Sequence, residues 1–189
     1  MPDALWLSSA YNIMSSPERI CVSSGASGNL VSILQKFTEP RASARCRVPE
    51  DVEGLDIEFL RTSIQEVESS GGHSDAPPVK TNRTRYPRVY KHIIYAVPTF
   101  ANPRPEDTQA NADADHLPNI PPRIVDVDLN LDGGLQNDFG NVASNSSFSK
   151  TIGPGVRTGW NEATPAFTHA LSSLGSQSRA AVLRTCPRH

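Results

Sequence analysis

The sequence predicts an α/β domain, and three segments carry this prediction. Residues 17–38 combine a short β-prone run, a turn of small residues and a run with helical spacing. Residues 92–97, "HIIYAV", form a continuous apolar run of the kind found in buried parallel strands. A further strand-like run, "RIVDVDL", covers residues 123–129. Strands that alternate with helices are typical of α/β folds.

In the first segment, "RICVSS" is the β-prone run and "SGASGN" is the turn. Leu30, Ile33, Leu34 and Phe37 then recur at the spacing of one helix face. The first N–H groups of a helix have no partner inside it and can bind an anion, commonly phosphate. An ordinary strand-to-helix connection would have the same pattern, so this segment alone does not decide between the two.

The remaining elements follow in order. We expect an extended piece, a turn at Glu53-Gly54 and an amphipathic helix from about Asp56. Residues 69–88 and 104–122 are polar, rich in proline and predict two loops. The second loop has an acidic cluster near His116, but its spacing matches no ligand motif, so no metal site is expected. A turn region at 132–140, a short strand within 141–150 and a short helix within 164–175 complete the chain.

Composition narrows the possible functions. A net charge of −2 over 189 residues provides no field that would attract nucleic acid or an anionic membrane. The longest apolar runs are far shorter than the ~20 residues of a membrane-spanning helix. The three cysteines share no metal-binding or redox spacing, and residues 1–14 do not resemble a signal peptide. We therefore expect a reduced, cytoplasmic protein with no membrane and no nucleic-acid partner.

The most informative stretch is "SNSSFSKTIGPGVRTGW", residues 144–160. It places Lys150 among serines and before a Gly-Pro-Gly turn and Arg157. A lysine amine can form a Schiff base with an aldehyde, while nearby hydroxyls and an arginine can hold a phosphate on the same molecule. A bare S-x-S-K would indicate only a surface lysine. The full string, with its turn and Arg157, favours a site that holds a phosphate-bearing aldehyde.

This string resembles the lysine signature of class I/II pyridoxal-phosphate-dependent aminotransferases of fold type I. "SSGASGNL" resembles the phosphate-binding glycine turn of that family, and "IIYAVPTFANP" resembles a strand end of its aminoadipate or multisubstrate branch. "PEDVEGLDIEFL" resembles a segment between the two. The resemblance implies a partial, incomplete large domain with a mainly parallel sheet and flanking helices.

The resemblance also implies roles for individual residues. Lys150 would hold pyridoxal 5'-phosphate as the internal aldimine and would shuttle protons. Asn102 would hydrogen-bond the ring hydroxyl oxygen of the cofactor. The cofactor phosphate would be held by the remaining predicted site residues, which are Gly25, Ala26, Ser27, Ser147, Ser149 and Arg157. The expected substrates are an amino acid and a 2-oxo acid, and the family is expected to form homodimers.

The resemblance extends over 17–168, with residues 1–16 as an unmatched N-terminal segment and 169–189 as an irregular tail. Family segments are missing inside it, as expected of a chain shortened by internal deletions. Between Pro40 and Arg41 the family has a strand and a helix carrying an aromatic residue that stacks on the cofactor ring. The aspartate for the ring nitrogen has no clear equivalent, and Asp126 is the nearest strand aspartate.

Three functions stay open on this basis. The first is an aminotransferase whose activity is reduced by the missing segments. The second is a non-catalytic remnant that binds the cofactor weakly or pairs with a full-length relative. The third is a lyase or decarboxylase on the same fold, because the lysine motif does not determine the reaction type.

Overall fold

The computed structural model describes residues 16–40, 47–51, 54–69, 78–96, 122–149, 152–153 and 155–174. The chain forms two compact units. The first comprises Met1–Thr38, Lys80–Val89 and Pro122–His189, and the second comprises Glu39–Val79 and Tyr90–Pro121.

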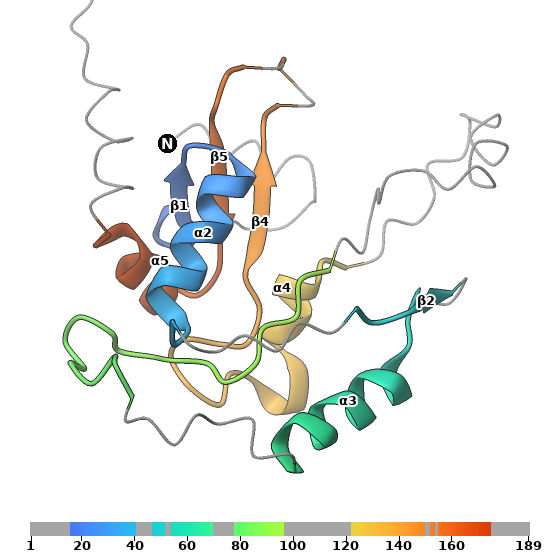
Figure 1. Cartoon of the computed structure of the whole chain (residues 1–189). Coiled ribbons are helices and arrows are strands. Elements are labelled where there is room, and N and C mark those ends of the chain that lie inside the picture. The colour runs from blue at the N-terminus through green and yellow to red at the C-terminus, as the bar shows by residue number, and fades with distance from the viewer. Residues whose placement is uncertain are drawn as a thin grey trace, which may run out of the picture. The chain divides into compact units, whose positions relative to one another are not determined.

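A three-stranded sheet is the centre of the first unit (Figure 1). Its strands are β1 (Ile20–Ser23), β4 (Ser144–Ser147) and β5 (Gly159–Glu162), in the order β1-β5-β4. Both pairings are antiparallel, so β1 and β4 run in the same direction on either side of β5. Ser23 pairs with Gly159, and Gly159 pairs with Ser147, so these three residues form one row across the sheet.

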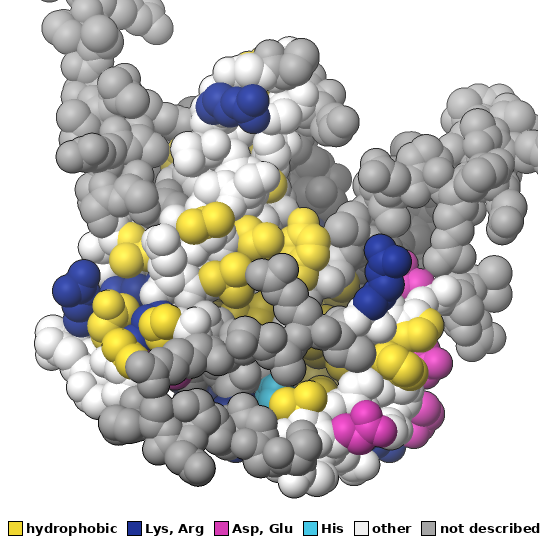
Figure 2. All heavy atoms as spheres, viewed as in Figure 1, with side chains coloured by type: hydrophobic (Ala, Val, Ile, Leu, Met, Phe, Trp, Pro, Cys, Tyr) yellow, Lys and Arg dark blue, Asp and Glu magenta, His cyan; other side chains and the backbone are white. Residues whose placement is uncertain are grey.

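Two helices cover this sheet and supply much of the core. Helix α2 (Ala26–Phe37) packs across the strands, and α5 (Pro165–Ser172) packs against α2 and β1 (Figure 1). The rings of Phe37 and Phe167 stack with their centroids 4.1 Å apart. The outer face of α2 keeps Val31 and Leu34 exposed, and Figure 2 shows hydrophobic side chains there. Among the described residues, the buried hydrophobic ones are Cys21, Ile33, Phe37, Val125, Trp160, Ala163, Phe167, Ala170 and Leu171.

Several predicted elements are confirmed. The strand, glycine turn and helix of residues 17–38 are present as β1, Gly25 and α2, preceded by the short 3-10 helix η1 (Pro17–Arg19). The strand expected within 141–150 is β4, and the helix expected within 164–175 is α5. Helix α5 continues across residue 168, where the sequence suggested a boundary.

The second unit contains a small hairpin and one helix. Strands β2 (Glu50–Asp51) and β3 (Gly54–Leu55) pair antiparallel, as the predicted turn requires. The predicted amphipathic helix is α3 (Ile57–Ser69), and Asp56 caps it by accepting a hydrogen bond from the Phe59 N–H (2.8 Å). No residue of α3 is buried, and Ile57 on its apolar face is 55% exposed.

Two strand predictions are wrong. Residues predicted as the strand "RIVDVDL" form helix α4 (Ile124–Asp128), which is followed by the 3-10 helix η3 (Leu131–Gly133) in the predicted turn region. The buried residues of α4 are Val125 and Asp128, which share a helix face because they are three positions apart. The burial of Asp128 is compensated by hydrogen bonds that its carboxylate accepts from the N–H groups of Asn141 (2.9 Å) and Val142 (3.2 Å).

The apolar run at 92–97 is the second wrong prediction. Its described part, residues 92–96, has no regular secondary structure and is exposed, with Tyr95 62% exposed. Such a run becomes a buried strand only where strands and helices enclose it, and no described strand pairs with it. All described strands pair antiparallel. The described residues therefore show no part of the predicted parallel sheet, and the α/β fold stays a prediction.

The predicted loops are described only in part. Residues 78–88 contain no helix or strand, as expected, whereas 104–121 and the tail from 175 onward lie outside the described residues. Among the helices that the structure describes, none is both long and apolar enough to cross a lipid bilayer.

Candidate functional site

The turn before α2 is the first part of the candidate site. Gly25 has φ of 104°, a conformation that favours glycine, and it occupies the N-cap position of α2. No side chain caps this end, and the first turn contains no acidic residue. The Asn29 N–H is the first to bond back to the turn, at the Gly25 carbonyl (3.0 Å). The N–H groups of Ala26 and Ser27 therefore lie in the part of the helix that is suited to an anion.

The hairpin formed by β4 and β5 brings two of the predicted serines to the same end of the sheet. Ser147 ends β4 and lies in the row that contains Gly159 and Ser23. Its hydroxyl accepts a hydrogen bond from the Ser149 N–H (3.2 Å) and donates to the Ser149 hydroxyl (3.0 Å). Both serine side chains are half-buried. The end of β4 thus presents two adjoining hydroxyls, those of Ser147 and Ser149, beside β5.

A close backbone contact joins this hairpin to the glycine turn. A Cβ placed on Gly159 would lie 3.0 Å from the Gly25 Cα and would overlap the Ser146 carbonyl oxygen. Only a residue without a side chain fits here, because the three backbones meet. The predicted phosphate-binding turn and the serine hairpin are therefore direct neighbours in space.

Asn145 on β4 fixes the first turn of α2. Its amide Nδ2 donates to the Ala26 carbonyl (3.0 Å), and its Oδ1 accepts from the Asn29 side chain (3.0 Å). Asn29 is fully buried. These two bonds hold the start of the helix against the strand, and sequence patterns did not reveal them because the two asparagines are 116 positions apart.

The structure describes only part of the loop between β4 and β5. Lys150 and Asn102 both lie outside the described residues. On either side of Lys150, the Ile152 N–H donates to the Phe148 carbonyl (2.9 Å), and Phe148 packs on Trp160 with ring centroids 4.6 Å apart. Arg157 is exposed and adopts φ of 47°, an uncommon conformation for a residue with a side chain.

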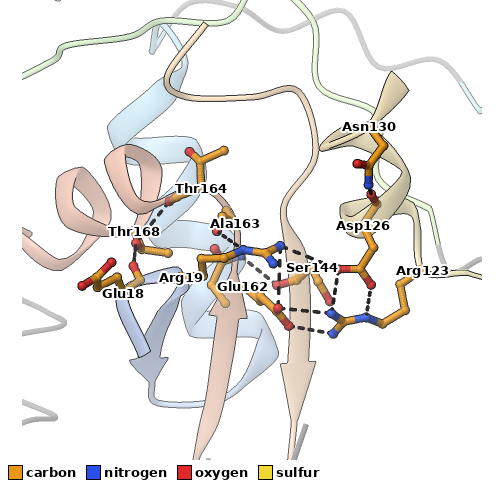
Figure 3. A network of polar contacts seen from close by, with 11 residues as sticks. Glu18, Arg19, Arg123, Asp126, Asn130, Ser144, Glu162, Ala163, Thr164 and Thr168 are labelled. Atoms are coloured by element: carbon orange, nitrogen blue, oxygen red, sulfur yellow. Dashed lines mark hydrogen bonds and ion pairs between the residues drawn. The ribbon is translucent and has the colours of Figure 1, made fainter. Parts of the chain in front are cut away.

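Asp126 belongs to a different set of contacts (Figure 3). The Arg123 guanidinium donates to both Asp126 oxygens (2.7 and 3.0 Å) and to both Glu162 oxygens (2.6 and 3.1 Å). Arg19 lies within 3.8 Å of Asp126 and 3.7 Å of Glu162. Asp126 is thus paired with arginines and lies on a helix, so it is not the strand aspartate that the sequence placed nearest to the role of ring-nitrogen partner.

The chain has a distant similarity to a yeast protein. The chain is 27% identical over 138 residues to "Uncharacterized protein YER152C" of Saccharomyces cerevisiae (strain ATCC 204508 / S288c). The match covers 58% of this chain and 31% of the yeast protein, so the chain corresponds to about a third of that relative. No protein-family model and no solved structure matches the chain.

Proposed function

We propose that the chain is an aminotransferase-like protein that binds pyridoxal 5'-phosphate and transfers an amino group between an amino acid and a 2-oxo acid. One observation carries the proposal. The glycine turn at the start of α2 and the Ser147–Ser149 hairpin adjoin each other through the contact of Gly159 with Gly25. The hairpin leads directly into Lys150, which is the residue that the sequence motif selects.

The described residues fit a phosphate group. The start of α2 offers backbone N–H groups and a positive dipole end, and no acidic residue in its first turn opposes an anion. The hydroxyls of Ser147 and Ser149 can donate to phosphate oxygens, and each can exchange its present hydrogen bond for one to the ligand. Arg157 is exposed and can supply a planar pair of donors that matches two phosphate oxygens.

When bound, pyridoxal phosphate acts as an electron sink for amino-acid chemistry, and the protein supplies position and charge. In this proposal the Lys150 amine is the covalent attachment point and carries a proton between atoms of the substrate. The start of α2, the two serines and Arg157 hold the phosphate. Asn102 donates its side-chain amide to the ring hydroxyl oxygen.

We expect turnover to be slow. Asp126 is paired with Arg123 and lies on α4, so it does not supply a carboxylate to the ring nitrogen. The stacking aromatic residue that the resemblance places between Pro40 and Arg41 is not in the sequence. The same observation on Asp126 favours the second candidate, a protein that binds the cofactor without completing a reaction.

The decisive experiment maps the attachment point. The full-length protein is incubated with pyridoxal phosphate, reduced with borohydride and digested, and the label is located by mass spectrometry. The label is expected on Lys150 and is expected to disappear in Lys150→Arg but to persist in the matched control Lys91→Arg, since Lys91 is an exposed lysine. Label divided evenly among Lys36, Lys80 and Lys91 would refute the assignment.

A half-reaction then separates the two candidates. Stopped-flow absorbance with a panel of amino acids should show slow spectral changes, well below the ~10 s⁻¹ typical of enzymes. A spectrum that no amino acid changes would support the non-catalytic candidate. Rates near the enzyme median would mean that the missing segments matter less than proposed.

A further inference from the structure

Lys36 is a buried cation at the other end of α2. The residue is 3% exposed and lies in the last turn of the helix. Its amine donates to the Ser173 hydroxyl (2.9 Å) and lies 6.0 Å from the centre of the Tyr86 ring. No carboxylate of the described residues is within ion-pair distance of it. A buried charge that has no counter-charge among the described residues is costly, so this arrangement calls for an explanation.

Lys36 shares the negative end of α2 with a second buried cation. Lys80 is also buried, and its amine donates to the carbonyls of Gln35 and Thr38 at this helix end. The Arg85 guanidinium carbon and the Lys80 amine lie 5.5 and 5.0 Å from the centre of the Tyr86 ring. Burial and, to a smaller extent, the charge of Arg85 lower the pKa of Lys36. Three cations therefore surround one aromatic ring, and Lys80 takes up two of the carbonyls at this helix end.

The Lys36 side chain borders a cavity of about 280 Å³. The polar groups around this cavity include the hydroxyls of Thr84 and Ser173, and its apolar wall includes Phe139, Ala166 and Ala170. This size is close to the lower end of the ~300–1,000 Å³ range of small-molecule pockets, which are mostly apolar with a few placed polar groups. The cavity thus combines a cationic end with an apolar wall.

We propose that this cavity binds a small organic carboxylate whose short aliphatic chain lies against the apolar wall and whose carboxylate accepts a hydrogen bond from Lys36. The Ser173 hydroxyl donates to the Ala170 carbonyl (2.7 Å) and positions the Lys36 amine by accepting from it. A carboxylate neutralises Lys36 with charge-assisted hydrogen bonds, and its chain replaces water on the apolar wall. Inorganic phosphate fits less well, because it is hydrated on all sides and would face apolar groups.

The site is separate from the proposed cofactor site. Gly25 and Lys36 lie at opposite ends of α2, and a rise of 1.5 Å per residue places them roughly 16 Å apart along the helix axis. Binding at Lys36 should therefore be unchanged in Lys150→Arg, whether or not that variant binds pyridoxal phosphate.

The test uses butyrate as the probe in two measurements on the full-length protein. Acetic anhydride labelling is continued until the buried Lys36 is modified in the free protein. Peptide mapping should then show that butyrate protects Lys36 and leaves the exposed Lys91 unprotected. Calorimetric titration should show butyrate binding that is 10- to 100-fold weaker in Lys36→Met, which corresponds to the ~1.5–3 kcal/mol of a charged hydrogen bond. The matched control Lys91→Met should bind butyrate like the wild type.

Three results would overturn the proposal: equal protection by neutral butyramide, tighter binding of inorganic phosphate than of butyrate, or unchanged butyrate affinity in Lys36→Met. If Lys36→Met does not fold, Ser173→Ala replaces it, and a several-fold loss of butyrate affinity is expected. Undiminished affinity in that variant, together with unprotected Lys36 in the wild type, would equally overturn it.

Discussion

At the scale of single residues, Glu162 is a charged side chain that is enclosed by the protein and paired with arginine. It is fully buried, and both of its oxygens accept hydrogen bonds from Arg123. Burial alone would lower the pKa of Arg123, but hydrogen bonds and charge interactions with Glu162 and Asp126 outweigh it and raise that pKa. Arg19 approaches the same two acids and also donates to the Ala163 carbonyl (3.3 Å). The group joins η1, α4 and β5 through charges that must remain paired.

We therefore predict that Glu162→Gln destabilises the protein by about 3 kcal/mol, since breaking a buried ion pair leaves an uncompensated charge. Urea unfolding followed by circular dichroism measures the change. The control is Glu58→Gln, because Glu58 pairs with Arg61 on the surface and such pairs contribute about 0–1 kcal/mol. Equal effects of the two substitutions would show that the buried group is not a stabilising centre.

At the scale of elements, the hairpin and the start of α2 depend on one glycine. Gly159 lies in the central strand of the sheet, where a Cβ atom would meet both the Ser146 carbonyl of β4 and the backbone of the Gly25 turn. Trp160 and Asn161, which follow it, are buried. The position of the predicted phosphate-binding turn relative to the serines is thus set by how closely these backbones approach.

We predict that Gly159→Ala destabilises the protein by about 1–3 kcal/mol, because the new methyl group overlaps backbone atoms that cannot move independently. Affinity for pyridoxal phosphate should fall in the same variant. Gly28→Ala is the matched control. Its added methyl group would overlap only the hydroxyl of the exposed Ser24 side chain, which can rotate away, and alanine is about 0.5–1 kcal/mol better than glycine inside a helix. Thermal unfolding and cofactor titration of both variants provide the measurement.

The same elements show what sequence reasoning could and could not reach. The strand, turn and helix of 17–38 were predictable because a glycine turn separates two local patterns with different periods. Strand β5 was not, because "GWNE" has no alternating pattern, and its burial comes from β1 and β4 on either side. In the candidate site, Gly159 contacts Gly25, and beside it Arg123 pairs with Glu162. Both contacts join residues that are far apart in the sequence, so a single sequence does not reveal them.

At the scale of the whole molecule, the two units differ in how much they bury. Among the residues that the structure describes, the buried hydrophobic ones all belong to the first unit, in β1, α2, α4, β5, α5 and at Ala163 between the last two. In the second unit, α3 has no buried residue, and Ile57 and Phe59 are exposed; Figure 2 shows hydrophobic and acidic side chains exposed there. Local stability follows burial, so the two units should open with different free energies.

We predict that hydrogen exchange monitored by mass spectrometry will separate the units. Peptides covering Gly159–Glu162 and Pro165–Ser172 should be protected, because these segments are buried in the core. Peptides covering Ile57–Ser69 should exchange within seconds to minutes, since an isolated helix of this length is marginal in water. Protection of α3 equal to that of β5 would contradict this view of the second unit.

The pairing of β1 with β5 also bears on how the protein is made. Ile20 pairs with Glu162, so about 140 residues must be synthesised after β1 before its partner strand exists. At ~5–20 residues per second, β1 and the start of α2 wait roughly 7 to 28 s on the ribosome without their sheet. During this time the edge of β1 and the apolar face of α2 are open to other chains. Chaperones that bind nascent chains would thus have a long opportunity at the segment that later forms the turn proposed to bind the cofactor phosphate.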